Sequence, residues 1–254
     1  MSSLLSDDDP PAFQIERPDG ASDFMLVCDH AGRALPRRLG DLGMTARELA
    51  THVAWDIGIA GVGRALSARL DAFLILQTYS RLVIDANRPP GSPQSIVTLS
   101  ERTRVPGNDG VSRADAESRE REVFRPYHDR IRAELDRRTQ AKRASVLIAL
   151  HSFTPRFMDS ERAWHAGVLY NRDPRLGRAL LALLRAEAGL VVGDNEPYAL
   201  GDATDYTIVT HGEQRGLPHV EIEIRQDLIA EPGGQLAWVE RLARLLEQAR
   251  MNAL

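Results

Sequence analysis

The sequence has little cysteine and no long apolar run. Its 254 residues include one cysteine, Cys28, so no internal disulfide can form, which fits a reducing compartment. No apolar run approaches the ~20 residues that a membrane-spanning helix needs. Residues 1–11 are polar and acidic, without the basic and apolar regions of a signal peptide. We therefore expect a cytoplasmic protein with no membrane partner.

An excess of positive charge is lacking as well. The 32 lysines and arginines are outnumbered by 36 aspartates and glutamates, which gives a formal net charge of −4. This composition does not provide the basic surface of a nucleic-acid-binding protein. The chain also lacks a phosphate-binding loop, a dinucleotide-binding glycine motif after a strand, and a Gly-x-Ser-x-Gly nucleophile motif. We expect a small molecule, and no nucleic acid, as the partner.

Apolar runs of strand length alternate with helical patterns along the chain. The elements that decide the fold are strands over 24–28, 82–84 and 145–150 and a long helix over 114–140. The first and third runs are continuously apolar, which is typical of strands buried on both faces. This alternation predicts an α/β sandwich with a largely parallel sheet, in a single domain over residues 23–254. Residues 1–22 are predicted to form a loose arm.

Two histidines each come directly after a buried-looking strand. His30 ends the segment Val-Cys-Asp-His, and His151 ends the segment Leu-Ile-Ala-Leu-His. Open α/β sheets place their sites at the carboxyl ends of parallel strands, so these side chains can face one cleft. One such histidine alone would more often be a structural hydrogen-bonding group, but two in matching contexts favour a metal site. A catalytic zinc takes three protein ligands and keeps a fourth position for water.

A third ligand has three candidates nearby in the sequence. Asp56 follows a tryptophan at the start of a predicted helix, where it could instead cap that helix. His52 is the rival ligand. Asp29 adjoins His30 and could orient an imidazole by accepting a hydrogen bond from its outer nitrogen.

Glu223 is the candidate general base. It lies with Glu221 on one face of an otherwise apolar strand, and carboxylates there are costly to bury without partners. A carboxylate close to a metal-activated water can accept its proton. The alternative is an edge strand whose polar face meets solvent.

Arginine and asparagine side chains suggest a clamp for a substrate carboxylate. The planar guanidinium of Arg88 can bind a carboxylate in bidentate geometry, and Asn87 adds a donor and an acceptor. Arg81 can bind either that carboxylate or a developing oxyanion. His211 lies in a polar stretch that could form a wall of the pocket. The alternatives are an arginine paired with a surface acid and a histidine exposed to solvent.

At these residues the sequence resembles the N-formylglutamate amidohydrolase family. The resemblance spans residues 25–230, and its most specific part is the Tyr-Ser-Arg and Asp-Ala-Asn-Arg-Pro block within 79–89. The matching segments are 27–32, 54–56, 79–89, 126–129, 149–152 and 222–224. The resemblance implies a three-layer α/β/α sandwich around a mixed, largely parallel sheet, similar to zinc exopeptidases and aspartoacylases.

The resemblance also implies a mechanism. One zinc ion per chain would be held by His30, Asp56 and His151. Another divalent metal also suits a mixed histidine and aspartate set. Glu223 matches the catalytic glutamate, and Asn87 with Arg88 matches a carboxylate-binding pair. The expected reaction is hydrolysis of the amide bond of an N-formyl or N-acyl amino acid, such as N-formylglutamate.

The sequence departs from the related enzymes at two places. Arg33 stands three residues after His30, where zinc carboxypeptidases carry a glutamate ligand, so Asp56 is inferred as the third ligand. Cys-Asp-His stands where formylglutamate deformylases carry Pro-His, which leaves another acyl amino acid open as substrate. Two alternatives also stay open: a zinc carboxypeptidase or peptidoglycan amidase, and a non-catalytic module that binds an acyl amino acid.

Overall fold

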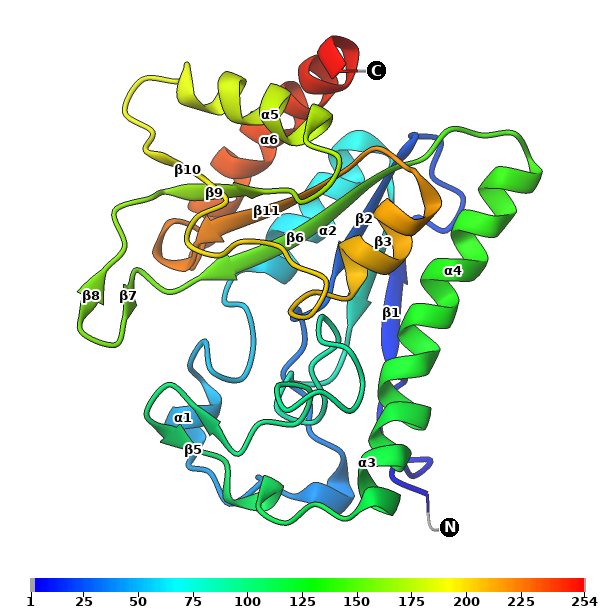
Figure 1. The fold of residues 1–254 in the computed structure, drawn as a ribbon, viewed down its shortest axis with the longest axis vertical. Coiled ribbons are helices and arrows are strands. Elements are labelled where there is room, and N and C mark those ends of the chain that lie inside the picture. Colours follow the sequence, from blue (N-terminus) through cyan, green and yellow to red (C-terminus); the bar gives the residue numbers. More distant parts are fainter. Residues whose placement is uncertain (1–2, 254) are drawn as a thin grey trace.

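A seven-stranded mixed sheet forms the centre of the computed structural model, which describes residues 3–253 (Figure 1). The strands lie in the order β1-β3-β2-β6-β11-β9-β10. Their bounds are β1 (Phe13–Glu16), β2 (Phe24–Cys28), β3 (Phe73–Gln77), β6 (Val146–Phe153), β9 (Ala166–Leu169), β10 (Val192–Asp194) and β11 (His219–Arg225). The neighbours β3, β2, β6 and β11 are parallel, whereas β1 and β9 pair with their neighbours β3 and β11 in the antiparallel direction. The predicted mixed, largely parallel sheet is confirmed.

Helices cover both faces of the sheet. Three of them, α2, α5 and α6, pack on one face, and α4 lies on the other (Figure 1). The helices are α1 (Ala46–Leu49), α2 (Ile59–Leu70), α3 (Arg113–Arg119), α4 (Arg125–Gln140), α5 (Arg175–Arg185) and α6 (Pro232–Ala253). A π-helical turn joins α3 to α4, which gives the predicted long helix over 114–140. The predicted three-layer α/β/α sandwich is confirmed.

Two short hairpins project from the carboxyl edge of the sheet. One consists of β4 (Leu99–Ser100) and β5 (Thr103–Arg104), and the other of β7 (Arg156–Phe157) and β8 (Ser160–Glu161). Within residues 3–253, no helix has both the length and the apolar character needed to cross a membrane.

The strand residues alternate between two hydrophobic cores, because successive side chains of a strand point to opposite faces. In β2, Leu26 and Cys28 pack in the core shared with α2, α5 and α6. Met25 and Val27 pack in the other core, with Ile131 of α4. Burial raises the pKa of the Cys28 thiol, so this cysteine packs as a small apolar group.

The N-terminal segment differs from the predicted loose arm. Phe13–Glu16 forms the edge strand β1, paired with β3, and Leu4 is buried. The backbone amides of Leu4 and Leu5 donate to the Glu122 carboxylate at 2.8 and 2.9 Å. The acidic, proline-containing sequence does not predict these contacts, because each of them involves few apolar residues. The described part of the segment, residues 3–22, is therefore packed against the sandwich.

Two local predictions near the sheet edge are wrong. Residues 82–83 lie in a turn and Ile84 has no regular structure, so no strand forms here, although the three side chains are buried. A short apolar run indicates that its side chains are buried, and side chains can be buried in a turn as well as in a strand. Asp56 does not cap the helix that follows it, because Gly58 with φ 84° occupies the N-cap position of α2. The Asp56 carboxylate is therefore available for another role.

Gly32 couples the end of β2 to the end of β3. A Cβ atom at this position would lie 2.0 Å from the carbonyl oxygen of Thr78, closer than any real contact. The Thr78 carbonyl also accepts a hydrogen bond from the backbone N–H of Ala34 at 3.2 Å. The turn that places His30 depends on this close approach of two backbones.

Gly32→Ala is therefore expected to lower the free energy of unfolding by about 3 kcal/mol, because the backbone must move to admit the methyl group. Urea denaturation measures this change. Gly233→Ala is the matched control, since a Cβ there meets nothing within 4 Å and the position is helical. Equal stability of the two variants would contradict the prediction.

Candidate metal centre

The predicted metal ligands meet at the carboxyl edge of the parallel strands. His30 follows β2, and His151 lies in the neighbouring strand β6. Asp56 lies in the loop before α2, and its backbone N–H donates to the carbonyl of His30 at 2.9 Å. Each of the three residues is only 3% exposed. The strand ends thus deliver two imidazoles and one carboxylate to one buried point.

One atom of each side chain faces a common centre. Nδ1 of His151 lies 3.2 Å from Nδ1 of His30 and 3.1 Å from Oδ2 of Asp56. Nδ1 of His30 lies 3.6 Å from the same Asp56 oxygen. These residues form a cluster whose ligand atoms lie within 4.8 Å of one another, which could hold a metal ion. Three such ligands leave a position for water in catalytic zinc sites.

The outer nitrogen of each imidazole faces a carboxylate. Nε2 of His30 lies 2.7 Å from Oδ1 of Asp85, and Nε2 of His151 lies 3.3 Å from Oδ2 of Asp29. A neutral imidazole that keeps its proton on the outer nitrogen presents a lone pair on the inner one. Two inward lone pairs and a carboxylate oxygen repel one another unless a cation lies among them. The donor set therefore fits a metal ion.

Buried carboxylates give this region an excess of negative charge. Burial alone would lower the pKa of His151, but Glu221, Asp29 and Asp56 outweigh it and hold that pKa well above its ordinary value. Burial alone would raise the pKa of Asp85, but its interactions with His30 and Arg81 hold it well below its ordinary value. Without a metal, a proton on His151 balances part of the negative charge.

A metal ion must displace that proton, because only a neutral imidazole nitrogen can coordinate. Metal affinity is therefore expected to weaken as the pH falls below the raised pKa of His151, by up to about tenfold per pH unit for the one proton displaced. Zinc titration against a chromophoric chelator at pH 6, 7 and 8 measures the trend. An affinity independent of pH would contradict it.

His52 does not join the cluster. Its Nε2 lies 2.6 Å from Oε1 of Glu101, and its side chain is about a quarter exposed. His52 does line the cavity that surrounds the ligand cluster. Within the described residues, the carboxylate of Asp56 and not the imidazole of His52 completes the set of possible ligands.

Glu223 lies beside His151 on the adjacent strand. The two residues are register partners in the parallel pair β6 and β11, so their side chains share one face of the sheet. β11 lies between β6 and β9 and is not an edge strand. Within residues 3–253, Oε2 of Glu223 has no hydrogen-bond partner. Burial, partly offset by His151, raises the pKa of Glu223 to about 7, which suits a group that both accepts and returns a proton.

Arg81 links the ligand cluster to its supporting carboxylates. Its Nη2 donates to Oδ2 of Asp85 at 2.9 Å, and its Nη1 lies 3.6 Å from Oδ1 of Asp56. Its side chain is a quarter exposed and lines the cavity. The guanidinium can therefore present a donor to a bound molecule while it holds these two aspartates in place.

Asn87 and Arg88 line the cavity. Contacts within the chain use a larger share of the hydrogen-bonding groups of Asn87 than of Arg88. Oδ1 of Asn87 accepts from the backbone N–H groups of Tyr206 and Thr207 at 3.0 Å each, and its Nδ2 donates to Asp205. Arg88 donates through Nη1 to the carbonyls of Asn87 and Thr204, and this nitrogen lies 3.6 Å from Oδ1 of Asp205. Asn87 thus holds the loop over the cavity, and Arg88 keeps further donors for a ligand.

The structure does not bring His211 to the cavity. Its ring stacks on His128, and its Nε2 lies 3.0 Å from Nδ1 of that residue. Burial lowers the pKa of both imidazoles, and that of His128 to about 4. His211 is buried behind the loop that Asn87 holds, so its predicted contact with substrate has no support in this geometry.

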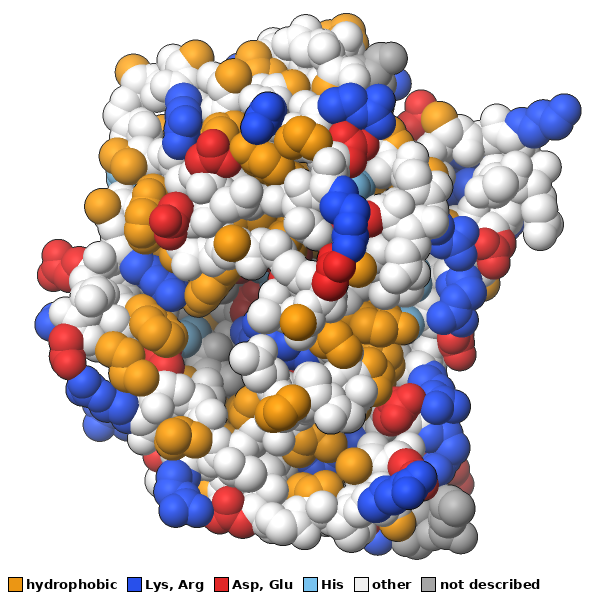
Figure 2. Space-filling model, in the orientation of Figure 1, with side chains coloured by type: hydrophobic (Ala, Val, Ile, Leu, Met, Phe, Trp, Pro, Cys, Tyr) orange, Lys and Arg blue, Asp and Glu red, His pale blue; other side chains and the backbone are white. Residues whose placement is uncertain are grey.

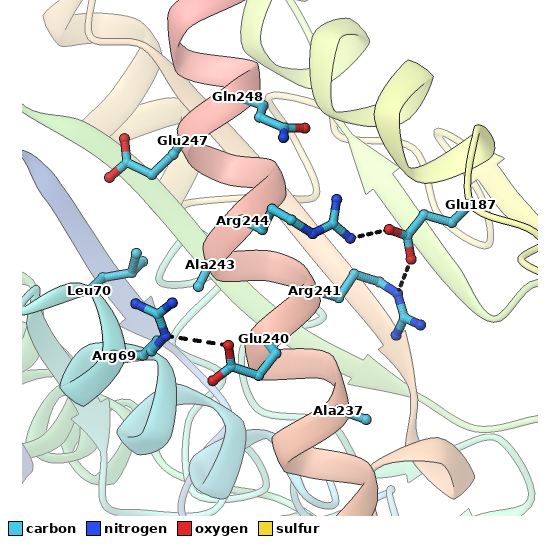
Figure 3. Close-up of a pocket in the computed structure, with 10 residues that line it drawn as sticks. All are labelled: Arg69, Leu70, Glu187, Ala237, Glu240, Arg241, Ala243, Arg244, Glu247 and Gln248. Carbon is cyan, nitrogen blue, oxygen red and sulfur yellow. Dashed lines mark hydrogen bonds and ion pairs between the residues drawn. The ribbon is translucent and has the colours of Figure 1, made fainter.

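These residues surround a cavity of about 510 Å³, and Figure 2 shows hydrophobic side chains beside a hollow in this face of the molecule. The predicted site residues that line it are His30, Asp56, Arg81, Asn87, Arg88, His151 and Glu223. A second cavity, of about 760 Å³, lies along α6 near α2 and α5 (Figure 3). Its arginines are paired within it: Arg69 with Glu240, and Arg241 and Arg244 with Glu187. The second cavity is larger, but the first contains buried polar atoms without hydrogen-bond partners among the described residues, including Oε2 of Glu223, which favours it as the functional site.

Sequence reasoning missed two supporting carboxylates. Asp85 orients His30, and Glu221 lies 3.9 Å from Nε2 of His151. Asp85 stands in the most specific motif, four residues after Arg81, but its ion pair with Arg81 forms through a turn where a strand was predicted. Glu221 was visible only as a second acid on the strand face of Glu223.

Several known proteins resemble this chain in sequence or in fold. A family model for N-formylglutamate amidohydrolases matches residues 22–230. The crystal structure of gene product Atu2144 from Agrobacterium tumefaciens is 37% identical, with a TM-score of 0.95 over 98% of both chains. An N-formylglutamate amidohydrolase from Ralstonia eutropha JMP134 shares the fold, with 21% identity and a TM-score of 0.70 over 96% of this chain and 98% of that one. No curated protein matches the chain. The family match covers most of the sequence, and the chain therefore belongs to the N-formylglutamate amidohydrolase family.

Proposed function

We propose that this protein is a metal-dependent amidohydrolase that cleaves the amide bond of an N-formyl or N-acyl amino acid, such as N-formylglutamate, in the cytoplasm. The observation that carries the proposal is the position of Glu223. Its buried carboxylate, with a pKa near neutrality, lies in register with His151, a member of the possible ligand cluster. Zinc, one ion per chain, is the metal that best suits two imidazoles and a carboxylate, and another divalent ion is possible.

His30, Asp56 and His151 would hold the ion, which supplies Lewis-acid activation of the attacking water and of the amide carbonyl. Glu223 accepts the proton of that water as its oxygen bonds to the amide carbon. The C–N bond then breaks, and Glu223 returns the proton to the leaving amine. The carboxylic acid thereby gains the hydroxyl group of the water, and the amine gains its proton.

The two arginines bind different parts of the substrate. Arg81, whose Nη1 lies close to Asp56, offers a hydrogen-bond donor to the oxyanion that develops on the amide oxygen. Arg88 binds the carboxylate of the amino acid, and Asn87 supports it by fixing the loop at Tyr206. Holding the substrate at both ends lowers the barrier by several kcal/mol through orientation.

A metal assay and a hydrolysis screen test this function. We expect about one zinc per chain after metal-replete purification, and hydrolysis of N-formyl-L-glutamate or its N-acyl analogues by the loaded protein. Preference for a short peptide or a peptidoglycan fragment would favour a carboxypeptidase or amidase. Binding of acyl amino acids without metal and without turnover would favour a non-catalytic module and overturn the proposal.

A further inference from the structure

The mouth of the catalytic cavity carries an unusual share of exposed apolar surface. Among large hydrophobic side chains of residues 3–253, Leu99, Phe157 and Tyr198 are 55%, 37% and 42% exposed, and all three line this cavity. The two arginines and the buried carboxylates lie deeper, so the cavity joins a charged floor to an apolar rim. Apolar side chains gathered at a ligand site commonly contact an apolar part of the ligand.

The aromatic part of this rim is fixed in place by one arginine. The guanidinium of Arg162 lies 4.7 Å from the ring centres of both Phe157 and Tyr198, and 5.7 Å from that of Phe153. It also donates to the Tyr198 hydroxyl at 2.9 Å. Stacking of this kind orders the rings before any ligand arrives. We call Phe153, Phe157 and Tyr198 the aromatic wall.

Leu99 reaches the same region from the other hairpin. Arg102, in the turn between β4 and β5, donates to Asp159, in the turn between β7 and β8, at 2.5 Å. This pair joins the hairpin that carries Leu99 to the hairpin that carries Phe157. The rim is therefore built from two segments that are far apart in sequence and meet over the cavity.

The two phenylalanines of the aromatic wall and the two arginines reach the ligand cluster from different strands. Arg81 and Arg88 lie in the segment that follows β3, on one side of His30 and His151. Phe153 lies in β6 and Phe157 in β7 beyond it, whereas Tyr198 comes from the segment after β10, which also contacts Arg88 through Thr204 and Asp205. An amino acid whose carboxylate lies at Arg88 and whose amide lies at the ligand cluster would therefore direct its acyl group toward Phe153 and Phe157.

We infer that the substrate carries an apolar acyl group of several carbon atoms, because a formyl group ends at the scissile carbon and leaves the aromatic wall and Leu99 without a contact. This inference rests on the proposed amidohydrolase function and specifies its substrate class. The wall and Leu99 determine specificity for the acyl group, while Arg88 reads the carboxylate at the other end.

A series of N-acyl-L-glutamates tests the inference on the zinc-loaded protein, with formyl, acetyl, butanoyl, hexanoyl and phenylacetyl groups. We expect kcat/KM to rise about fourfold per added methylene, as burial of each group on an apolar surface predicts. A formyl substrate that is the best of the series would overturn the inference and leave the proposed function standing. Absence of hydrolysis across the series would overturn both.

Variants of the rim locate the effect. Phe157→Ala is expected to lower the hexanoyl-to-acetyl ratio of kcat/KM about tenfold. Met158→Ala is the matched control, because Met158 is 40% exposed on the same hairpin but does not line the cavity, so its ratio should equal that of the parent. Leu99→Ala provides an independent variant on the other hairpin. An unchanged ratio in both rim variants, or an equal loss in Met158→Ala, would contradict the assignment.

Discussion

Glu223→Gln is expected to lower kcat by about 10³-fold while the chain keeps its metal. Glutamine has nearly the same shape as glutamate but cannot accept a proton from water. The side chain is buried, and its Oε2 makes no hydrogen bond within residues 3–253, so the substitution breaks no contact of the fold. The ligand cluster does not include Glu223, so metal content should remain near one per chain.

Glu221→Gln is the matched control, since Glu221 lies two residues away on the same face of β11. Its carboxylate lies 3.9 Å from the outer nitrogen of His151, which gives it a positioning role. We expect a smaller loss of kcat than for Glu223→Gln. Measuring kcat and metal content of both variants decides between them. Near-normal activity of Glu223→Gln, or a larger loss in Glu221→Gln, would exclude Glu223 as the base.

The layers of the fold and the position of the ligand pair could be predicted because they follow from burial. Continuous apolar runs identify strands covered on both faces, and parallel strands bring their carboxyl ends together. His30 and His151 therefore had to lie at one edge once β2 and β6 were recognised as neighbours. Glu223 was predicted from the cost of burying its carboxylate on an apolar strand and from the family resemblance, and the sheet adds its register with His151.

The contacts that turn these residues into a site depend on loops, whose path the sequence pattern does not determine. Asp85 reaches His30 from 55 residues away, through a turn that the sequence presented as a strand. His211 lies against His128, 83 residues away, and this pairing removes it from the cavity. Phe157 of the aromatic wall lies on a strand of two residues, which is too short to show a period of its own.

The family resemblance and the geometry support different parts of the site. The resemblance gave the order of the motifs and the reaction class, but it expects a glutamate ligand that the chain lacks after His30. The geometry offers a specific replacement. Asp56 is held at both ends, because its backbone N–H donates to the His30 carbonyl and its Oδ2 accepts from the backbone N–H of Ser152 at 3.0 Å.

Asp56→Asn is accordingly expected to weaken zinc binding by more than about 100-fold, a larger loss than outer-shell substitutions cause. The amide can still accept the Ser152 hydrogen bond, so the loop should keep its place, but it supplies no negative charge between the two Nδ1 atoms. Loss of activity should follow the loss of metal and recover in part at high zinc concentration. Competition with a chelator measures the affinity.

His52→Ala separates this interpretation from its rival. His52 and Asp56 lie four residues apart and both line the cavity, but only Asp56 faces the two imidazoles. The His52 variant should therefore retain about one zinc per chain with an affinity close to that of the parent. If His52→Ala loses zinc and Asp56→Asn retains it, the third ligand is the imidazole, and the chain must shift the segment 52–56 when the metal binds.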